Sequence, residues 1–155
     1  MKIVTLNSFE MRFARKMGEA RQERRMKEGR RNRMGSAGGA EDHIVGVMGE
    51  MAFAKLANKY PSGLFLDMDE DDDVGGVQVR CRRKHYMDLY LWESDPEDAW
   101  YALLTGTGPE FQFHGVVWGA LGKVKSNWTK AQVPFPRVDC YIVPRRQLST
   151  DLSRV

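Results

Sequence analysis

The sequence lacks the features that mark membrane, secreted or metal-thiolate proteins. It contains only two cysteines, Cys81 and Cys140, and their separation does not match the spacing of metal-ligand motifs. No run of roughly 18 apolar residues is present, so no transmembrane helix is expected. The opening stretch MKIVTLNSF has too few apolar residues for a signal peptide. We therefore expect a cytoplasmic protein whose two thiols are reduced.

Several well-known catalytic motifs are also missing. The sequence has no Walker loop, no GxSxG and no HExxH, which removes support for nucleotide hydrolases of that type, α/β-hydrolases and zincins. Only 6 of the 155 residues are proline, and the chain is 42% hydrophobic and 29% charged. That composition is typical of a globular domain and excludes a collagen-like or wholly disordered chain. The length predicts one domain with one substantial core.

Charge is divided unevenly along the chain. Residues 10–34 contain ten Lys or Arg and four Glu, whereas residues 41–79 contain two Lys and nine Asp or Glu. A basic stretch can bind a polyanion such as nucleic acid, and clustered carboxylates can hold a divalent cation. The simpler interpretation is a solvated basic helix followed by a solvated acidic turn. Both interpretations stay open on charge alone.

Hydrophobic periodicity predicts two helices followed by strands. The helices are expected at 8–33 and 41–60, with a Gly-rich linker at 34–40, and the strands at 64–66, 77–82, 87–93, 100–105, 111–118 and 140–143. This order predicts an α+β fold with a mostly antiparallel sheet. We divide the chain into a basic N-terminal helix with its linker (1–40), a core (41–145) and a polar tail (146–155).

Four residues in this plan could form a catalytic site. Glu50 lies in the middle of the second helix among small and apolar residues, and Asp73 ends the acidic run. Gln78 and Arg80 are two apart on one strand, so they share a face. Oxygens from Glu50, Asp73 and Gln78 would suit Mg²⁺ or Mn²⁺. Arg80 would then stabilise charge that develops on a phosphate.

The motifs around these residues resemble the PD-(D/E)XK nuclease superfamily, and most closely its small Holliday-junction-resolvase-like and phage-encoded members. The resemblance rests on G-x-x-G-E-x-A, D-V-G-G-x-Q-V-R, L-Y-L, W-Y-A-L-L-T-G and F-H-G-V-V-W-G, and covers roughly residues 44–120. It implies a restriction-endonuclease-like core and a metal-dependent DNA endonuclease, acting on branched, phage or host DNA. Glu50, Asp73 and Gln78 match the family's metal ligands, and Arg80 stands where the family has Lys. A phage origin would place the protein in the host cytosol.

The sequence departs from the family pattern at two of these positions. Arginine stays protonated and cannot act as a base, and Gln78 removes a negative charge from the metal site. Lys84 lies on the same strand face as Arg80, but about 13 Å further along. We therefore expect slow cleavage. One alternative is a degenerate nuclease fold that binds nucleic acid or a host protein without cutting. Another is a phage inhibitory protein that acts through its basic helix.

The same resemblance and the charge pattern suggest a DNA-binding surface, with a homodimer left open. Its candidate residues are Arg21, Arg24, Arg25, Arg30 and Arg31 of the basic helix and Arg82, Arg83 and Lys84 after the 77–82 strand. Trp128 stands among lysines and is a further candidate contact. Simpler interpretations also apply. Glu50 could form a salt bridge to an arginine of the basic helix, and Gln78 and Arg80 could be the exposed face of an edge strand.

Overall fold

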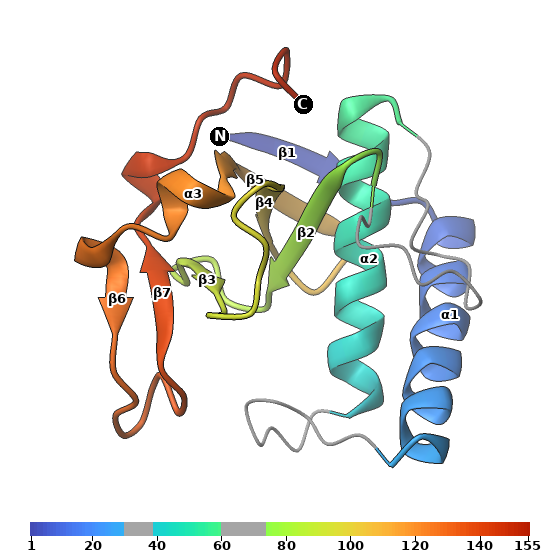
Figure 1. The fold of residues 1–155 in the computed structure, drawn as a ribbon. Helices are drawn as coiled ribbons and strands as arrows, with labels where there is room; N and C mark the ends of the chain where they lie inside the picture. Colours follow the sequence, from blue (N-terminus) through green and yellow to red (C-terminus); the bar gives the residue numbers. More distant parts are fainter. Residues whose placement is uncertain (30–38, 60–73) are drawn as a thin grey trace.

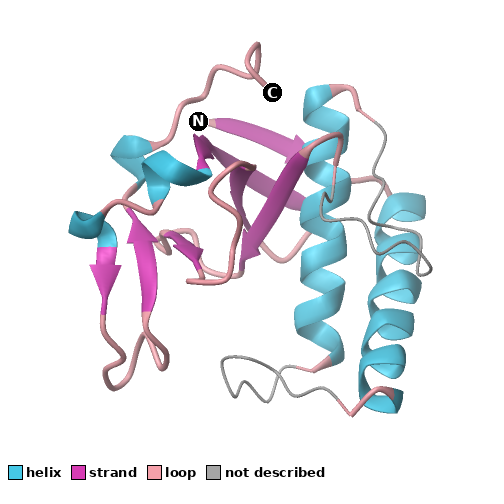
Figure 2. Cartoon of the chain, in the orientation of Figure 1, coloured by secondary structure: helices cyan, strands magenta, loops and turns pink. Residues whose placement is uncertain are grey.

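The computed structural model describes residues 1–29, 39–59 and 74–155. Two long helices lie side by side against a four-stranded sheet, and a three-stranded sheet lies on the other side (Figures 1 and 2). The helices are α1 (Ser8–Lys27), α2 (Ala40–Ala57) and the short α3 (Gly119–Gly122). The strands are β1 (Lys2–Thr5), β2 (Val77–Arg82), β3 (Leu89–Leu91), β4 (Trp100–Thr105), β5 (Glu110–Trp118), β6 (Trp128–Thr129) and β7 (Cys140–Val143).

The larger sheet has the order β1-β5-β4-β2 and the smaller sheet the order β3-β7-β6. β1 and β4 both pair antiparallel with β5, while β2 pairs parallel with β4. The parallel pair arises because the chain leaves β2, forms β3 in the smaller sheet and then returns to β4. The α+β class with a mixed, mostly antiparallel sheet is thus confirmed. The sequence predicted one sheet, whereas the strands form two.

The N-terminal region is part of the core. β1 pairs with β5 in the register Lys2 to Phe113, although the hydrophobic pattern predicted no strand there. Val4 in β1 and Ala14 in α1 are both buried in the main hydrophobic cluster. Residues 1–29 therefore contribute an edge strand and a helix that packs on the core. A strand of four residues with one buried side chain is too short for sequence periodicity to reveal.

Local signals explain where the helices start and end. Asn7 caps α1 and forms a capping box with Glu10, with both hydrogen bonds present. Glu28 ends that helix and Gly29 follows with φ +68°, so α1 is shorter than the predicted 8–33. α2 ends at Asn58 in the left-handed conformation. None of the helices in the described ranges is long and apolar enough to cross a membrane.

Two hydrophobic clusters lie on opposite faces of the larger sheet. One joins α1 and α2 to the sheet, and the other lies between the two sheets. The first includes Ile44, Val47, Phe53, Val77, Val79 and Phe113, and the second includes Leu89, Leu91, Tyr101, Leu103, Val117 and Val143. The strand predicted at 87–93 is shorter, at Leu89–Leu91. The strand predicted at 64–66 and the acidic run 67–73 fall outside the described residues.

Gly18 sets how closely α1 approaches α2. A Cβ atom on Gly18 would lie 2.5 Å from the Cα and N atoms of Ile44, whereas a Cβ on Gly46 would meet nothing within 4 Å. We expect Gly18→Ala to destabilise the fold by about 1–3 kcal/mol through overpacking. Gly46→Ala is the matched control, and it should stabilise the fold by about 0.5–1 kcal/mol. Chemical denaturation of both variants measures the difference. Equal effects of the two substitutions would contradict the described contact.

Candidate functional site

Arg80 is held on the polar face of β2 by three neighbours. Its guanidinium Nη2 donates to Asp95 Oδ1 at 3.0 Å, and Nη1 lies 3.4 Å from Gln78 Oε1. The guanidinium also lies over the ring of Tyr101, 5.5 Å from its centroid. Tyr101 belongs to the cluster between the sheets, so this face of β2 is directed toward the smaller sheet. The shared face predicted for Gln78 and Arg80 is confirmed.

Asp95 is a site residue that no sequence pattern indicated. It is 9% exposed, and its second oxygen, Oδ2, accepts a hydrogen bond of 2.7 Å from the Trp92 backbone N–H. Asp95 lies between the strands predicted at 87–93 and 100–105, a position that is compatible with the backbone hydrogen bond of a turn but does not indicate the ion pair. The pairing of Arg80 with Asp95 depends on the excursion of the chain through β3. No local pattern in the sequence signals that excursion.

Glu50 forms a buried ion pair with Arg21 of α1. The carboxylate Oε1 and Oε2 accept from Arg21 Nη1 and Nη2 at 2.7 and 2.9 Å. The Glu50 side chain is 6% exposed and that of Arg21 is 22% exposed. This bidentate geometry is the strongest form of arginine–carboxylate contact. The simpler interpretation of Glu50, a salt bridge to the basic helix, is confirmed.

Glu50 lies on one side of β2, and the side chains of Gln78 and Arg80 lie on the other side. Val77 and Val79 point toward α2, and a Cβ on Gly49 would lie 2.4 Å from Cys81 Cβ. Glu50 therefore approaches β2 from the side of the helices. On that side, burial raises the pKa of the Cys81 thiol to about 12, and the negative charge of Glu50 adds to the effect. Gln78 and Arg80 project from the other side. Asp73 lies outside the described residues, so the convergence of the three proposed metal ligands stays a prediction.

The donor atoms that are described do not fit a Mg²⁺ site. Both Glu50 oxygens accept from Arg21, and the Gln78 amide oxygen faces Arg80. Mg²⁺ requires oxygen ligands with near-octahedral geometry, and a guanidinium held against the same oxygens opposes a cation. Within ranges 1–29, 39–59 and 74–155, no three His, Cys, Asp or Glu side chains group in a way that could hold a metal. We therefore assign no metal-dependent step to these residues.

The cations predicted on α1 divide into paired and half-buried groups. Arg24 pairs with Glu28 one turn later at 3.2 Å, a weak surface contact. Arg25 is half-buried near His43 of α2. Burial, followed by the charges of Arg25 and Arg21, lowers the pKa of His43. His43 is thus a neutral side chain among cations at neutral pH. Arg30 and Arg31 lie outside the described residues.

The cations predicted after β2 lie at the end of that strand. Arg82 stacks over the ring of Tyr90 at 4.4 Å, and burial lowers its pKa. Among the described residues, Arg82 has no carboxylate within ion-pair distance. Arg83 is exposed and pairs with Asp42 of α2 at 2.8 Å, and Lys84 is exposed. Among the residues that the structure describes, positive charge therefore exceeds negative charge at this end of the strand.

Trp128, the further aromatic candidate, begins β6 and is packed within the smaller sheet. Its ring meets that of Tyr141 edge-on, with centroids 4.8 Å apart. The backbone of Trp128 also pairs with Tyr141 in the β6–β7 ladder. The half-buried Trp128 is therefore a sheet residue, in a segment for which the sequence predicted no strand. Its role in binding stays a prediction.

No protein-family model, curated protein or solved structure matches the chain. The resemblance to PD-(D/E)XK nucleases therefore stays a prediction drawn from the residues. What the structure establishes of the fold is the coarser α+β class with its mixed, mostly antiparallel sheet.

A second polar cluster joins β4 and β5 near the end of β2. The buried Thr105 hydroxyl lies 2.9 Å from His85 Nδ1 and 2.7 Å from His114 Nε2. Burial is the largest cause that lowers the pKa of His114 to about 4, with the charge of Arg145 second. His114 is therefore neutral in the folded protein at neutral pH. Thr105 at the centre of the cluster is 0% exposed, whereas His114 is half-buried and His85 is exposed.

This cluster makes stability depend on pH. In the unfolded chain His114 takes up a proton near its ordinary pKa of about 6.5, whereas the folded protein resists protonation down to about pH 4. The unfolded state binds more protons between these values, so stability should fall as pH falls through that window. His114→Gln should flatten this part of a curve of unfolding free energy against pH. A curve identical to that of the wild type would contradict the assignment.

Proposed function

We propose that this protein binds nucleic acid through a cationic surface formed by α1 and the end of β2, and that it does not cut what it binds. The observation that supports the absence of cleavage is the Arg21–Glu50 pair. The carboxylate expected to hold a catalytic metal has a guanidinium on both oxygens. The part of the site that is described is thus built from arginine–carboxylate contacts rather than open carboxylates.

The proposed binding of nucleic acid rests on Lys and Arg side chains for which no ion pair with a described carboxylate is present. Residues 80–84 include four Lys or Arg, and of these Arg80 and Arg83 have acidic partners. Within the described ranges, Arg82 and Lys84 have no acidic partner and can contact an external anion. A half-buried guanidinium without a carboxylate is costly, and a phosphate offers the bidentate acceptor that guanidinium prefers. On α1, the exposed Arg12, Lys16 and Lys27 extend the positive charge.

The second candidate is metal-dependent DNA cleavage of the PD-(D/E)XK type. It is favoured by one observation, the turn that leads into β2. Val74 and Val77 exchange two backbone hydrogen bonds of 3.1 and 3.0 Å across Gly75 and Gly76. Asp73 precedes Val74 in the chain and Gln78 follows Val77, the order that the resemblance requires. Cleavage would also require Arg21 to release Glu50.

Binding is tested by fluorescence anisotropy with labelled duplex, single-stranded and branched DNA at several salt concentrations. We expect affinity to fall steeply with salt, because Lys and Arg displace counterions from phosphates. Arg82→Gln together with Lys84→Gln should lower the slope of log affinity against log salt by about 1–2. Arg154→Gln, an exposed arginine near the C-terminus, is the matched control and should leave the slope unchanged. Equal slopes in all three proteins would contradict the proposed surface.

The same preparations decide between binding and cleavage. Plasmid, branched and single-stranded DNA are incubated with the wild type in Mg²⁺ or Mn²⁺. The proposal predicts intact DNA. Cleavage that Asp73→Ala and Glu50→Gln both abolish would overturn it and establish the second candidate. If the Arg21→Gln variant alone gained cleavage, the Arg21 guanidinium would occupy the place of a metal ion at Glu50.

A further inference from the structure

The turn between β2 and β3 places an aromatic ring in solvent. In ranges 1–29, 39–59 and 74–155, Tyr86 is the most exposed aromatic side chain, at 80%. Within the same ranges its ring takes part in no hydrogen bond and no contact with another ring or cation. An aromatic face that is left in water can stack against a planar ligand. The ring of Tyr86 is therefore open to a ligand.

The turn itself is fixed from its inner side. The Met87 N–H donates to the Lys84 carbonyl oxygen at 3.1 Å, which closes a four-residue turn around Tyr86. The His85 ring belongs to the polar cluster that joins β4 and β5. Arg145 Nη2 donates to the carbonyl oxygens of His85 and Met87. Because the backbone on both sides of Tyr86 is already held in place, a ligand that contacts the ring has little more of the chain to order.

Uncompensated positive charge lies next to this ring. Among the described residues, Arg82 and Lys84 have no acidic partner, and the carboxylate of Asp88 lies 3.8 Å from an arginine that follows β7. Arg82 stacks over the ring of Tyr90 at 4.4 Å. Burial raises the pKa of Tyr90, the charge of Arg82 lowers it, and the nearby Tyr86 adds to the rise. Tyr86 and Arg82 thus lie near the same tyrosine.

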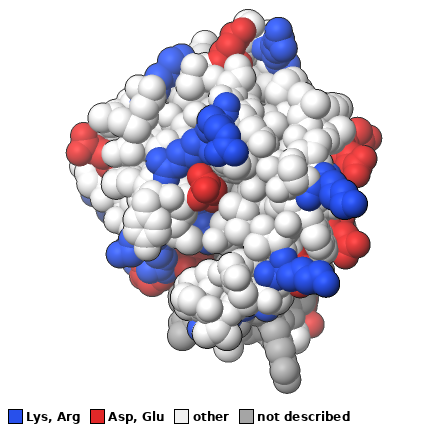
Figure 3. Space-filling model, turned by 90° about the vertical axis from the view of Figure 1, so that its left-hand side faces the viewer, with Lys and Arg blue, Asp and Glu red and all other residues white. Residues whose placement is uncertain are grey.

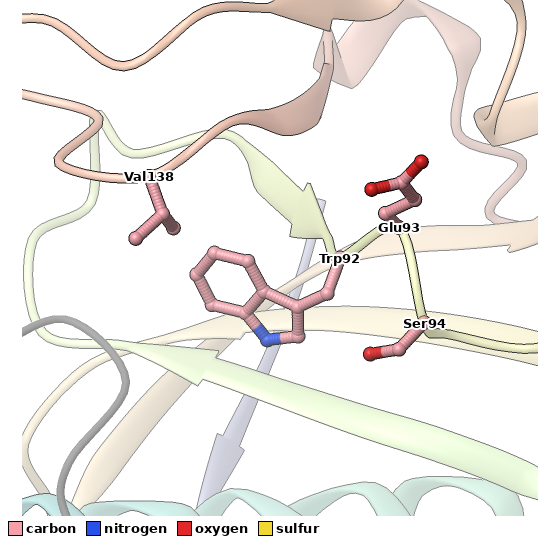
Figure 4. A pocket seen from close by; sticks show the side chains of 4 residues that line it. All are labelled: Trp92, Glu93, Ser94 and Val138. Carbon is pink, nitrogen blue, oxygen red and sulfur yellow. The ribbon is translucent and has the colours of Figure 1, made fainter.

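A second aromatic residue, Trp92, follows β3 in a less suitable setting. Figure 3, which views the molecule from the side of the smaller sheet, shows Lys and Arg groups set among largely uncharged atoms. Trp92 and Val138 face each other across a hollow of about 530 Å³ (Figure 4). Glu93 also lines this hollow, and its negative charge repels a phosphate. Tyr86, by contrast, follows three consecutive cations at 82–84.

We propose that Tyr86 stacks against an unpaired base of a bound nucleic-acid strand, while Arg82 and Lys84 contact the phosphates beside that base. The inference rests on the proposed nucleic-acid binding and adds the form of the ligand. A base inside a duplex is covered on both faces by its neighbours, so its face cannot reach the tyrosine. Unpaired bases stack on aromatic side chains in many single-strand binding proteins.

The test measures the binding of three labelled ligands by fluorescence anisotropy. They are an oligothymidine strand, a strand of equal length with abasic sites in place of the bases, and a duplex. Tyr86→Ala should weaken binding of the thymidine strand about tenfold, because a stacked base is lost. Binding of the abasic strand and of the duplex should stay unchanged, as should the salt dependence, because no positive charge is removed.

Three further variants show whether the ring is what matters. Tyr86→Phe keeps the ring and should bind all three ligands as the wild type does. Tyr86→Leu keeps an apolar side chain without a ring and should behave as Tyr86→Ala does. Phe135→Ala removes an exposed aromatic side chain outside the proposed surface and is the matched control, which should change nothing.

The outcomes separate this inference from the function on which it rests. If Tyr86→Ala and Tyr86→Leu bind the thymidine strand as the wild type does, the stacking site is refuted and nucleic-acid binding stands. The same conclusion follows if these variants weaken the thymidine and abasic strands equally, because the loss then does not involve the bases. If the wild type binds none of the three ligands, the proposed function and the stacking site both fail.

Discussion

The ion pair between Arg21 and Glu50 joins α1 to α2, the two helices that pack against the larger sheet. Arg21 lies on α1 and Glu50 on α2, and two hydrogen bonds of 2.7 and 2.9 Å connect them. α2 in turn covers the sheet face that carries Val77 and Val79. Removing one partner of a buried ion pair lowers the free energy of unfolding by about 3–5 kcal/mol, because the other charge is left unpaired. The stability of the fold therefore depends on both residues. The basic helix is therefore bound to the core by its charge as well as by its packing at Gly18.

This pair also determines what chemistry the helix carboxylate can do. A glutamate held by a bidentate guanidinium is neutralised and has its oxygens directed away from other ligands. On the opposite face of β2, Arg80 donates one hydrogen bond of 3.0 Å to Asp95, whose other oxygen accepts from the Trp92 N–H. The two residues that the sequence placed in one site are thus each engaged in a separate arginine–carboxylate contact. Excess positive charge remains at Arg82 and Lys84, where the proposed binding surface begins.

Much of the fold could be predicted from the sequence because periodicity reports burial directly. The alternation in Val77–Arg82 and the helical pattern of residues 41–60 both appear in the structure. β1 could not be predicted, because a strand of four residues carries too little pattern. The division into two sheets also escaped prediction, since it depends on the crossing between β2 and β4. Of the site, Gln78 and Arg80 were placed correctly on one face, whereas the pairing of Arg80 with Asp95 depends on that crossing.

The central claim is that Glu50 holds Arg21 and does not await a metal. The most direct test is a double-mutant cycle of Arg21→Met, Glu50→Gln and the two combined, with unfolding measured in the presence and absence of Mg²⁺. The account predicts that each single change destabilises the protein by about 3–5 kcal/mol, that the double change costs much less than the sum, and that Mg²⁺ leaves the wild type unchanged. A metal ligand would behave otherwise. Glu50→Gln would then leave stability equal or higher, and Mg²⁺ would stabilise the wild type but not this variant.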